Sequence, residues 1–255
     1  MTTAIRLSAP FAALAALALA APPAAATGAP ARKAAASAGA KKPVTKAGGA
    51  GAARGFAHQV EYRDGGHLLG NPEAETRLVE YMSYTCSHCY EFHREGDPAI
   101  RMLLLPGGKT SYEIRHSLRD IVDLTATMLT HCGAPGRFMA NHEALLAAQP
   151  KWMAKARGMT QAQMVRWNNG ALGARLRAVA SDLDFYELME ARGFTRAELD
   201  RCLTDEAKAQ SLAQTSARDN QQMNIPGTPS FAINGKLLDG VFSWGALKPF
   251  LDRKD

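Results

Sequence analysis

The stretch LVEYMSYTCSHCYEF, residues 78–92, decides the fold. Leu78 to Met82 is a short apolar run with the composition of a buried strand, and a helical pattern begins directly after the cysteines. Cys86 and Cys89 therefore fall at a strand-to-helix junction. The backbone turn at such a junction allows two cysteines three positions apart to close a small disulfide ring, which predicts a redox pair.

The position of Cys86 predicts an unusually acidic thiol. The free N–H groups of the first helical turn and the positive end of the helix dipole both favour a thiolate. Such placement lowers a cysteine pKa from ~8.5 to roughly 3.5–7.5. We expect His88 to stabilise the thiolate further and Cys89, one turn into the helix, to be the resolving thiol. A stabilised thiolate makes the disulfide a stronger oxidant.

Three other interpretations of the cysteine pair stay open, of which a pair of buried reduced thiols fits an exported protein worst. Cys86, Cys89, His88 and His93 could be zinc ligands, although structural zinc sites usually need a second C-x-x-C or H-x-x-x-H pair, which the sequence lacks. The pair could also form a purely structural disulfide, although a small, strained disulfide ring at the start of a helix would stabilise the fold only weakly. No nucleotide loop or flavin motif is visible, so we expect neither a cofactor nor a metal.

The first 58 residues differ from the rest of the chain. Arg6, the apolar run from Phe11 to Ala21, a proline pair and Ala24–Ala26 follow the pattern of a signal peptide over residues 1–26. An uncleaved anchor is the alternative, but a spanning helix needs ~20 apolar residues. Residues 27–58, rich in Ala, Gly, Lys and Pro, have the composition of a disordered tether. We therefore expect an exported protein of the periplasm or cell envelope.

The net charge of +6 belongs to this leading segment. Seven of the 30 basic residues precede position 59 and no acidic residue does, which leaves 23 basic against 24 acidic residues in the remainder. A nucleic-acid-binding domain should carry the basic surface itself, so no nucleic-acid partner is expected. Disulfides persist in exported proteins, so the four cysteines should be paired or poised to react.

The rest of the chain alternates between a few strands and many helices. A second strand is expected at 112–116, and nearly every segment from 120 to 222 has helical periodicity. Thr195 and Glu198 fit a capping box that opens one helix. Asn234-Gly235 is a strong hairpin signal between strands at 230–233 and 236–238, and a helix at 244–251 follows.

A second motif, IPGTPSF at residues 225–231, precedes the hairpin. A proline directly before a strand cannot donate to the sheet. A cis Thr228–Pro229 bond would place a backbone edge against the cysteines and leave it free to pair with an extended peptide. An ordinary Pro-Gly turn is the alternative.

Together, residues 78–92 and 225–235 resemble the corresponding segments of the DsbA-like disulfide oxidoreductases of the thioredoxin superfamily, and a looser resemblance runs from Val60 to the C-terminus. It implies an α/β, thioredoxin-like fold over 59–255 with a large α-helical insertion at about 120–222. The roles it implies are Cys86 as nucleophile, Cys89 as resolving cysteine, His88 as thiolate stabiliser, Pro229 as cis-proline, Thr228 as the residue whose backbone meets substrate, and Glu80 as a buried acid that assists proton transfer. An exposed strand acid is the alternative for Glu80.

The resemblance also implies a function. The protein would introduce disulfides into reduced exported proteins and be recharged by a DsbB-like membrane quinone reductase. It would act as a monomer, because the tether lacks the apolar patterning of the isomerase dimerisation domain. Ser87 replaces the proline of the best-known oxidant, so an isomerase or reductase stays open, as does a non-catalytic peptide-binding or chaperone module. A structural disulfide between Cys132 and Cys202 is the preferred interpretation, with two separate buried thiols as the alternative.

Overall fold

The computed structural model describes residues 55–56 and 58–252, so the predicted signal peptide and nearly all of the predicted tether lie outside the described residues. The chain forms a six-stranded sheet of order β1-β2-β4-β3-β5-β6. The strands are β1 (Val60–Arg63), β2 (Gly66–Gly70), β3 (Thr76–Met82), β4 (Thr110–His116), β5 (Ser230–Ile233) and β6 (Lys236–Leu237). Strands β3 and β4 are parallel, and the other neighbours are antiparallel.

Strand β3 lies in the interior of the sheet, between β4 and β5. Leu78 is fully buried and Met82 is 1% exposed. Leu78 and Met82 lie on one face of the strand, and Tyr81, 6% exposed, lies on the other, so a strand covered on both faces explains the apolar residues on either side of Glu80. The strand ends at Met82, so the residues that follow it emerge at one edge of a rigid sheet.

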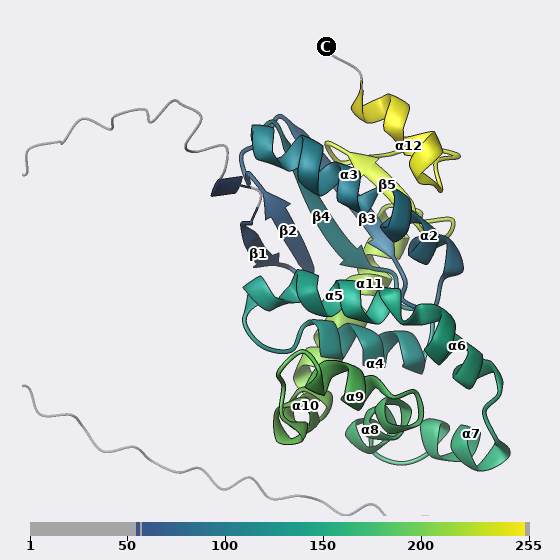
Figure 1. Ribbon diagram of the computed structural model, residues 1–255. Coiled ribbons are helices and arrows are strands. Elements are labelled where there is room, and N and C mark those ends of the chain that lie inside the picture. Colours follow the sequence, from purple (N-terminus) through teal and green to yellow (C-terminus); the bar gives the residue numbers. More distant parts are fainter. Residues whose placement is uncertain (1–54, 57, 253–255) are drawn as a thin grey trace, which may run out of the picture. The chain divides into compact units, whose positions relative to one another are not determined.

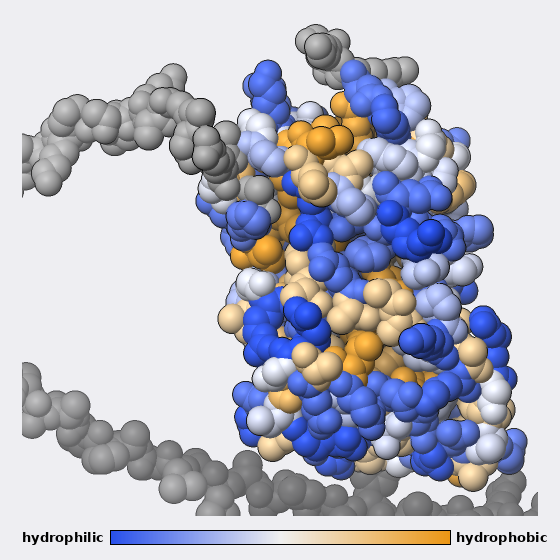
Figure 2. Space-filling view, viewed as in Figure 1, coloured by the Kyte–Doolittle hydropathy of each residue, from blue (hydrophilic) through white to orange (hydrophobic). Residues whose placement is uncertain are grey.

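The cysteine motif leads into α2 (Ser87–Glu95), which is followed by α3 (Asp97–Ala99) and the turns η1 (Ile100–Leu104) and η2 (Leu105–Gly107). Gly96 keeps a right-handed helical backbone, and Pro98 lies in the first turn of α3, where its missing N–H leaves no hydrogen bond unmade. The sequence pattern indicated an interruption here, and the structure shows a nearly continuous helical path. Met102 and Leu103 in η1 are 74% and 75% exposed, and Figure 2 shows apolar side chains gathered over this segment.

A block of helices separates β4 from β5. It comprises α4 (Ile121–Thr130), η3 (Pro135–Arg137), α5 (Phe138–Ala147), α6 (Gln149–Arg157), α7 (Gln161–Asn168), α8 (Leu172–Asp182), α9 (Phe185–Glu190), α10 (Arg196–Leu203) and α11 (Glu206–Gln222). Figure 1 shows α4 to α10 gathered at one end of the sheet, whereas α11 passes behind the strands. In the described part of the chain, no helix combines the length and apolar character needed to cross a membrane.

Several local predictions within and after this block are confirmed. Thr195 and Glu198 form the predicted capping box at the start of α10. Cys132, just after α4, is disulfide-bonded to Cys202 in α10. The C-terminal helix α12 (Trp244–Leu251) has the predicted bounds. The β1–β2 hairpin was not predicted; it turns at Asp64 and Gly65, which both adopt positive φ angles.

Candidate active site at the start of α2

Cys86 is the N-cap residue of α2, with extended backbone angles (φ −96°, ψ 121°) and no side-chain capping hydrogen bond. Its side chain is 6% exposed, and that of Cys89 is 1% exposed. Both are free thiols in this structure. The Cys86 thiol donates a hydrogen bond to the Thr228 carbonyl oxygen at 3.0 Å. The site therefore joins the helix start to the loop before β5.

Hydrogen bonds to the Cys86 sulfur make it acidic. The Cys89 thiol donates to this sulfur and has the largest effect; with the Thr228 side chain and the backbone N–H groups of Cys89 and His88, it lowers the pKa of Cys86 to about 5. Burial opposes this shift but is outweighed. Near neutral pH the reduced site therefore holds a Cys86 thiolate.

Cys89 has the opposite character. Burial raises the pKa of Cys89 well above its ordinary value, and the hydrogen bond to Cys86 and the nearby Glu80 carboxyl raise it further. The Ser83 backbone N–H donates to the Cys89 sulfur at 3.5 Å. The Cys86 sulfur is thus ionised and belongs to the less buried residue, whereas the Cys89 sulfur is protonated and more deeply buried.

The loop before β5 reaches the cysteines through the register of the sheet. In the antiparallel pair β3–β5, Tyr81 is opposite Ser230, so the residues before Ser230 lie at the C-terminal end of β3, where the cysteine motif follows. The Thr228–Pro229 peptide bond is cis. Pro229 is buried and Thr228 is half-buried, which places a short backbone edge beside Cys86.

His88 occupies a different position from the one predicted for a ring that stabilises the thiolate. Its side chain is exposed, and among the described residues no hydrogen bond joins its imidazole to the Cys86 sulfur. Its backbone N–H lowers the pKa of Cys86 instead. The stabilisation visible in this structure comes from the helix start rather than from the imidazole.

Glu80 is buried at 3% exposure, which settles the choice between a buried and an exposed acid. The Tyr112 hydroxyl donates to its carboxylate. Burial raises the pKa of Glu80 to about 8, and the negative charges of Asp97 and Cys86 act in the same direction. A carboxyl that exchanges its proton near neutral pH therefore lies close to the buried Cys89 thiol.

Two residues of the helical block, which sequence analysis missed, hold the loop that precedes Cys86. The buried Asp123 carboxylate of α4 accepts hydrogen bonds from the Ser83 hydroxyl (2.6 Å) and the Tyr84 N–H (2.8 Å). The Gln149 side-chain amide donates to the carbonyl oxygens of Tyr84 (2.7 Å) and Cys86 (2.9 Å). No sequence signal links them to the motif, because they lie about 40 and 60 positions further along the chain.

A second unpredicted feature is a group of buried imidazoles. The His131 ring lies 4.5 Å from that of His67 and 5.0 Å from that of His116, between ring centroids. The Tyr84 hydroxyl shares a 2.8 Å hydrogen bond with His142. Burial is the main cause that lowers the pKa of His67 and of His116 to about 3. Both ring nitrogens of His116 lack a hydrogen-bond partner among the described residues.

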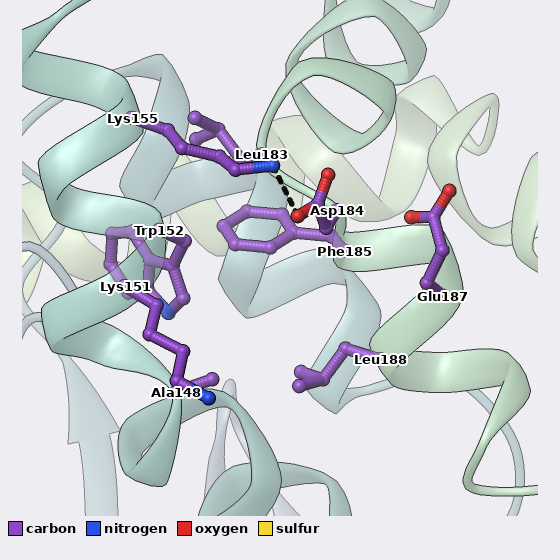
Figure 3. A pocket seen from close by; sticks show the side chains of 9 residues that line it. All are labelled: Ala148, Lys151, Trp152, Lys155, Leu183, Asp184, Phe185, Glu187 and Leu188. Atoms are coloured by element: carbon purple, nitrogen blue, oxygen red, sulfur yellow. Dashed lines mark hydrogen bonds and ion pairs between the residues drawn. The ribbon is translucent and has the colours of Figure 1, made fainter.

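A cleft of about 240 Å³ lies between α6 and α9, away from the cysteines. Trp152 and Phe185 meet edge to face within it, at 5.3 Å between ring centroids. Figure 3 shows Lys155 and Asp184 joined by an ion pair at its rim. Its lining contains no cysteine or histidine, so it has no part in thiol chemistry.

The strand order, a C-x-x-C pair at a helix start and an adjacent cis-proline loop define a thioredoxin-like redox site. The thioredoxin family model matches residues 63–253, and the chain belongs to this family.

Solved structures and curated relatives agree with this assignment. A protein-disulfide isomerase from Novosphingobium aromaticivorans is 44% identical, with a TM-score of 0.72 over 74% of this chain and 97% of that one. Wolbachia pipientis α-DsbA1 shares the fold at 23% identity, with a TM-score of 0.57 over 72% of this chain and 88% of that one. A Rickettsia bellii protein named as a protein-disulfide oxidoreductase is 27% identical over 169 residues, 66% of this chain and 56% of that protein. This chain spans little more than half the length of such curated relatives.

Proposed function

We propose that this protein is an exported enzyme that introduces disulfides into reduced polypeptides through Cys86 and Cys89. The observation that carries the proposal is the contrast between the two sulfurs. Cys86 has a pKa of about 5, whereas that of Cys89 is raised well above its ordinary value. A stabilised Cys86 thiolate stabilises the reduced form, so the disulfide form is a strong acceptor of electrons.

The reaction starts from the oxidised pair. A substrate thiolate attacks the Cys86 sulfur, the Cys86–Cys89 bond breaks, and Cys89 leaves with the electron pair. Glu80, which holds a proton below pH about 8, supplies the proton that Cys89 takes up. A second substrate thiolate then attacks the substrate sulfur of the mixed disulfide. Cys86 leaves as a thiolate, and the enzyme retains the two electrons until another disulfide donor oxidises it.

The loop before β5 orients the substrate in this proposal. Only the protonated Cys86 thiol donates to the Thr228 carbonyl oxygen, whereas the thiolate, the Cys86–Cys89 disulfide and a mixed disulfide have no proton to donate. That carbonyl becomes free to accept from a substrate backbone N–H, as in strand addition to an exposed edge. Pro229 has no N–H to compete for the same position. A substrate segment would therefore lie alongside Thr228 with its cysteine facing Cys86.

An isomerase is the second candidate, because the Novosphingobium protein that is 44% identical bears that name. The reduction potential separates the two. Strong oxidases have potentials near −120 mV and disulfide isomerases near about −180 mV, whereas thioredoxin lies near ~ −270 mV. Equilibration with glutathione buffers should give a reduction potential for the Cys86–Cys89 pair that is less negative than about −180 mV. A reduction potential near that of thioredoxin would exclude the oxidase.

A Cys89→Ser variant tests the proposed chemistry directly. Without the resolving thiol, Cys86 should accumulate mixed disulfides with envelope proteins, and Cys86→Ser should accumulate none. Export and reoxidation are separate parts of the proposal. Sequencing of the mature N-terminus tests the signal peptide, and deletion of a DsbB-like quinone reductase in the same cell should leave Cys86 and Cys89 reduced.

A further inference from the structure

A groove of about 560 Å³ opens near the nucleophile and is lined by residues at or beside α4, α6 and α7. Thr85, the residue before Cys86, contributes to its lining. Three methionines, Met153, Met159 and Met164, are among the apolar residues that line it. Methionine side chains are flexible and polarisable, so a surface built from them adapts to different apolar partners.

Helix α6 relates this groove to the reacting sulfur. Its first residue, Gln149, donates to the Cys86 carbonyl oxygen, and its last residue, Arg157, lines the groove. At 1.5 Å per residue, Arg157 lies about 12 Å along the helix axis from Gln149. An extended polypeptide rises about 3.3 Å per residue, so about four residues cover the same distance.

The charges of the groove favour an acidic partner. Arg119 and Arg157 are exposed, and neither guanidinium has an ion pair or hydrogen bond within the described part of the chain. Asp120 also lines the groove, but its carboxylate caps α4 by accepting from the Asp123 N–H at 2.8 Å. The guanidinium groups of Arg119 and Arg157 therefore have no partner among the described residues. A guanidinium group matches the geometry of a carboxylate.

We propose that this groove binds an extended segment of the reduced polypeptide substrate, with apolar side chains on the methionines and a carboxylate at Arg119 and Arg157. The spacing along α6 places that carboxylate about four residues from the reacting cysteine. The inference rests on the proposed function, because it specifies the substrates of the same site.

The test uses two peptides, each with two cysteines, that differ at one position. This position lies four residues from one of the cysteines and carries Asp in one peptide and Lys in the other. Leucines fill the positions between it and that cysteine. The wild type should oxidise the Asp peptide with the lower KM. Each substitution, Arg119→Gln or Arg157→Gln, should raise KM for the Asp peptide about threefold, and the double variant about tenfold, in line with ion pairs at a solvent-exposed site. The change should fall in KM rather than kcat.

Raising the salt concentration distinguishes a loss of charge recognition from damage to the structure as the cause of a raised KM. At about 1 M NaCl, where screening acts within about 3 Å, the difference between the two peptides should disappear. The exposed Arg192, two residues beyond the end of α9, lies outside the groove, and Arg192→Gln is the matched control with unchanged KM. Met164→Gln, at a side chain that is 43% exposed, should raise KM for both peptides.

Equal KM values for the two peptides in the wild type, or unchanged values in the double variant, would overturn the inference. A cysteine-free version of the Asp peptide tests the groove independently of the proposed function. Its binding is followed by fluorescence anisotropy and needs no redox chemistry. Weaker binding of this peptide by the double variant supports the groove even in a protein that fails to oxidise dithiothreitol. Failure with dithiothreitol counts against the proposed function alone.

Discussion

The buried imidazoles predict a specific acid sensitivity, which His116→Leu should reveal. His116, at the end of β4, is 5% exposed and makes no hydrogen bond through either ring nitrogen among the described residues. Its neighbours include the rings of Tyr84, His131 and Phe138. Leucine has a similar volume and needs no hydrogen bond, so the substitution removes the titrating group with little loss of packing.

The magnitude follows from proton linkage. Burial, with smaller effects of the Arg115 and Lys208 cations, lowers the pKa of His116 from 6.5 to about 3. Between these values the unfolded chain binds a proton that the folded chain rejects, so stability falls as the pH decreases below 6.5. A pH of 5 is about 1.5 units below the pKa of this imidazole in the unfolded chain. At 1.36 kcal/mol per unit, the folded state loses about 2 kcal/mol of stability at this pH.

Buried carboxyls act in the opposite direction. Burial raises the pKa of Glu80 to about 8 and that of Asp123 to about 7, so both add stability as the pH decreases from 8 towards 5. The total pH dependence therefore mixes both signs, and only the difference between variant and wild type isolates His116.

Urea denaturation at pH 7.5 and pH 5.0 measures this difference. The free energy of unfolding of His116→Leu relative to the wild type should rise by about 2 kcal/mol between pH 7.5 and pH 5.0. His58→Leu, at an exposed position, is the control and should show no comparable change. A difference for His116→Leu that stays constant between the two pH values would refute the reasoning.

Three further predictions follow from the site and its supports. Glu80→Gln should slow the formation of the mixed disulfide by at least about tenfold and remove the change in that rate near pH 8, because an amide cannot pass a proton to Cys89 as it leaves. Rapid-quench trapping of the mixed disulfide measures this rate, and an unchanged pH profile would exclude the role. Asp123→Ala should lower the unfolding free energy by about 3 kcal/mol, since two buried donors and the part-buried Arg119 N–H lose their acceptor, and a loss below about 1 kcal/mol in urea titration would contradict this. Replacing Cys132 and Cys202 with Ala should cost about 4 kcal/mol, as expected for a sequence separation of 70 residues, with the Cys86 titration unchanged as the check on specificity.

The parts of the fold that were predictable have local signals. Apart from Glu80, the residues from Leu78 to Met82 are apolar because β3 is covered on both faces. Asn234-Gly235 turns the last hairpin with positive φ at both residues. The β1–β2 hairpin has a comparable signal in Asp64-Gly65, but the Ala, Gly and Lys composition of the segment just before it obscures the strand pattern. Gly96 and Pro98 suggested a helix break, yet both are compatible with helical geometry in the positions they occupy.

The residues of the active site also divide into those with a local sequence signal and those without one. Cys86 and Cys89 follow from the motif alone, and the cis Thr228–Pro229 bond agrees with the expectation from the second motif. Asp123 and Gln149 could not be foreseen, because their hydrogen bonds to residues 83–86 depend on how α4 and α6 pack against the end of the sheet. His88 shows the converse: its position in the motif suggested a role for the ring, but its place in the first helical turn directs the backbone N–H to the sulfur and the ring outward.

Ultraviolet absorbance of the thiolate at 240 nm, followed from pH 3 to pH 9 in the fully reduced protein, examines the electrostatics of the nucleophile most directly. We predict a transition at pH about 5 that Cys86→Ser abolishes. A first transition near pH 8.5, the value of an ordinary cysteine, would contradict the account.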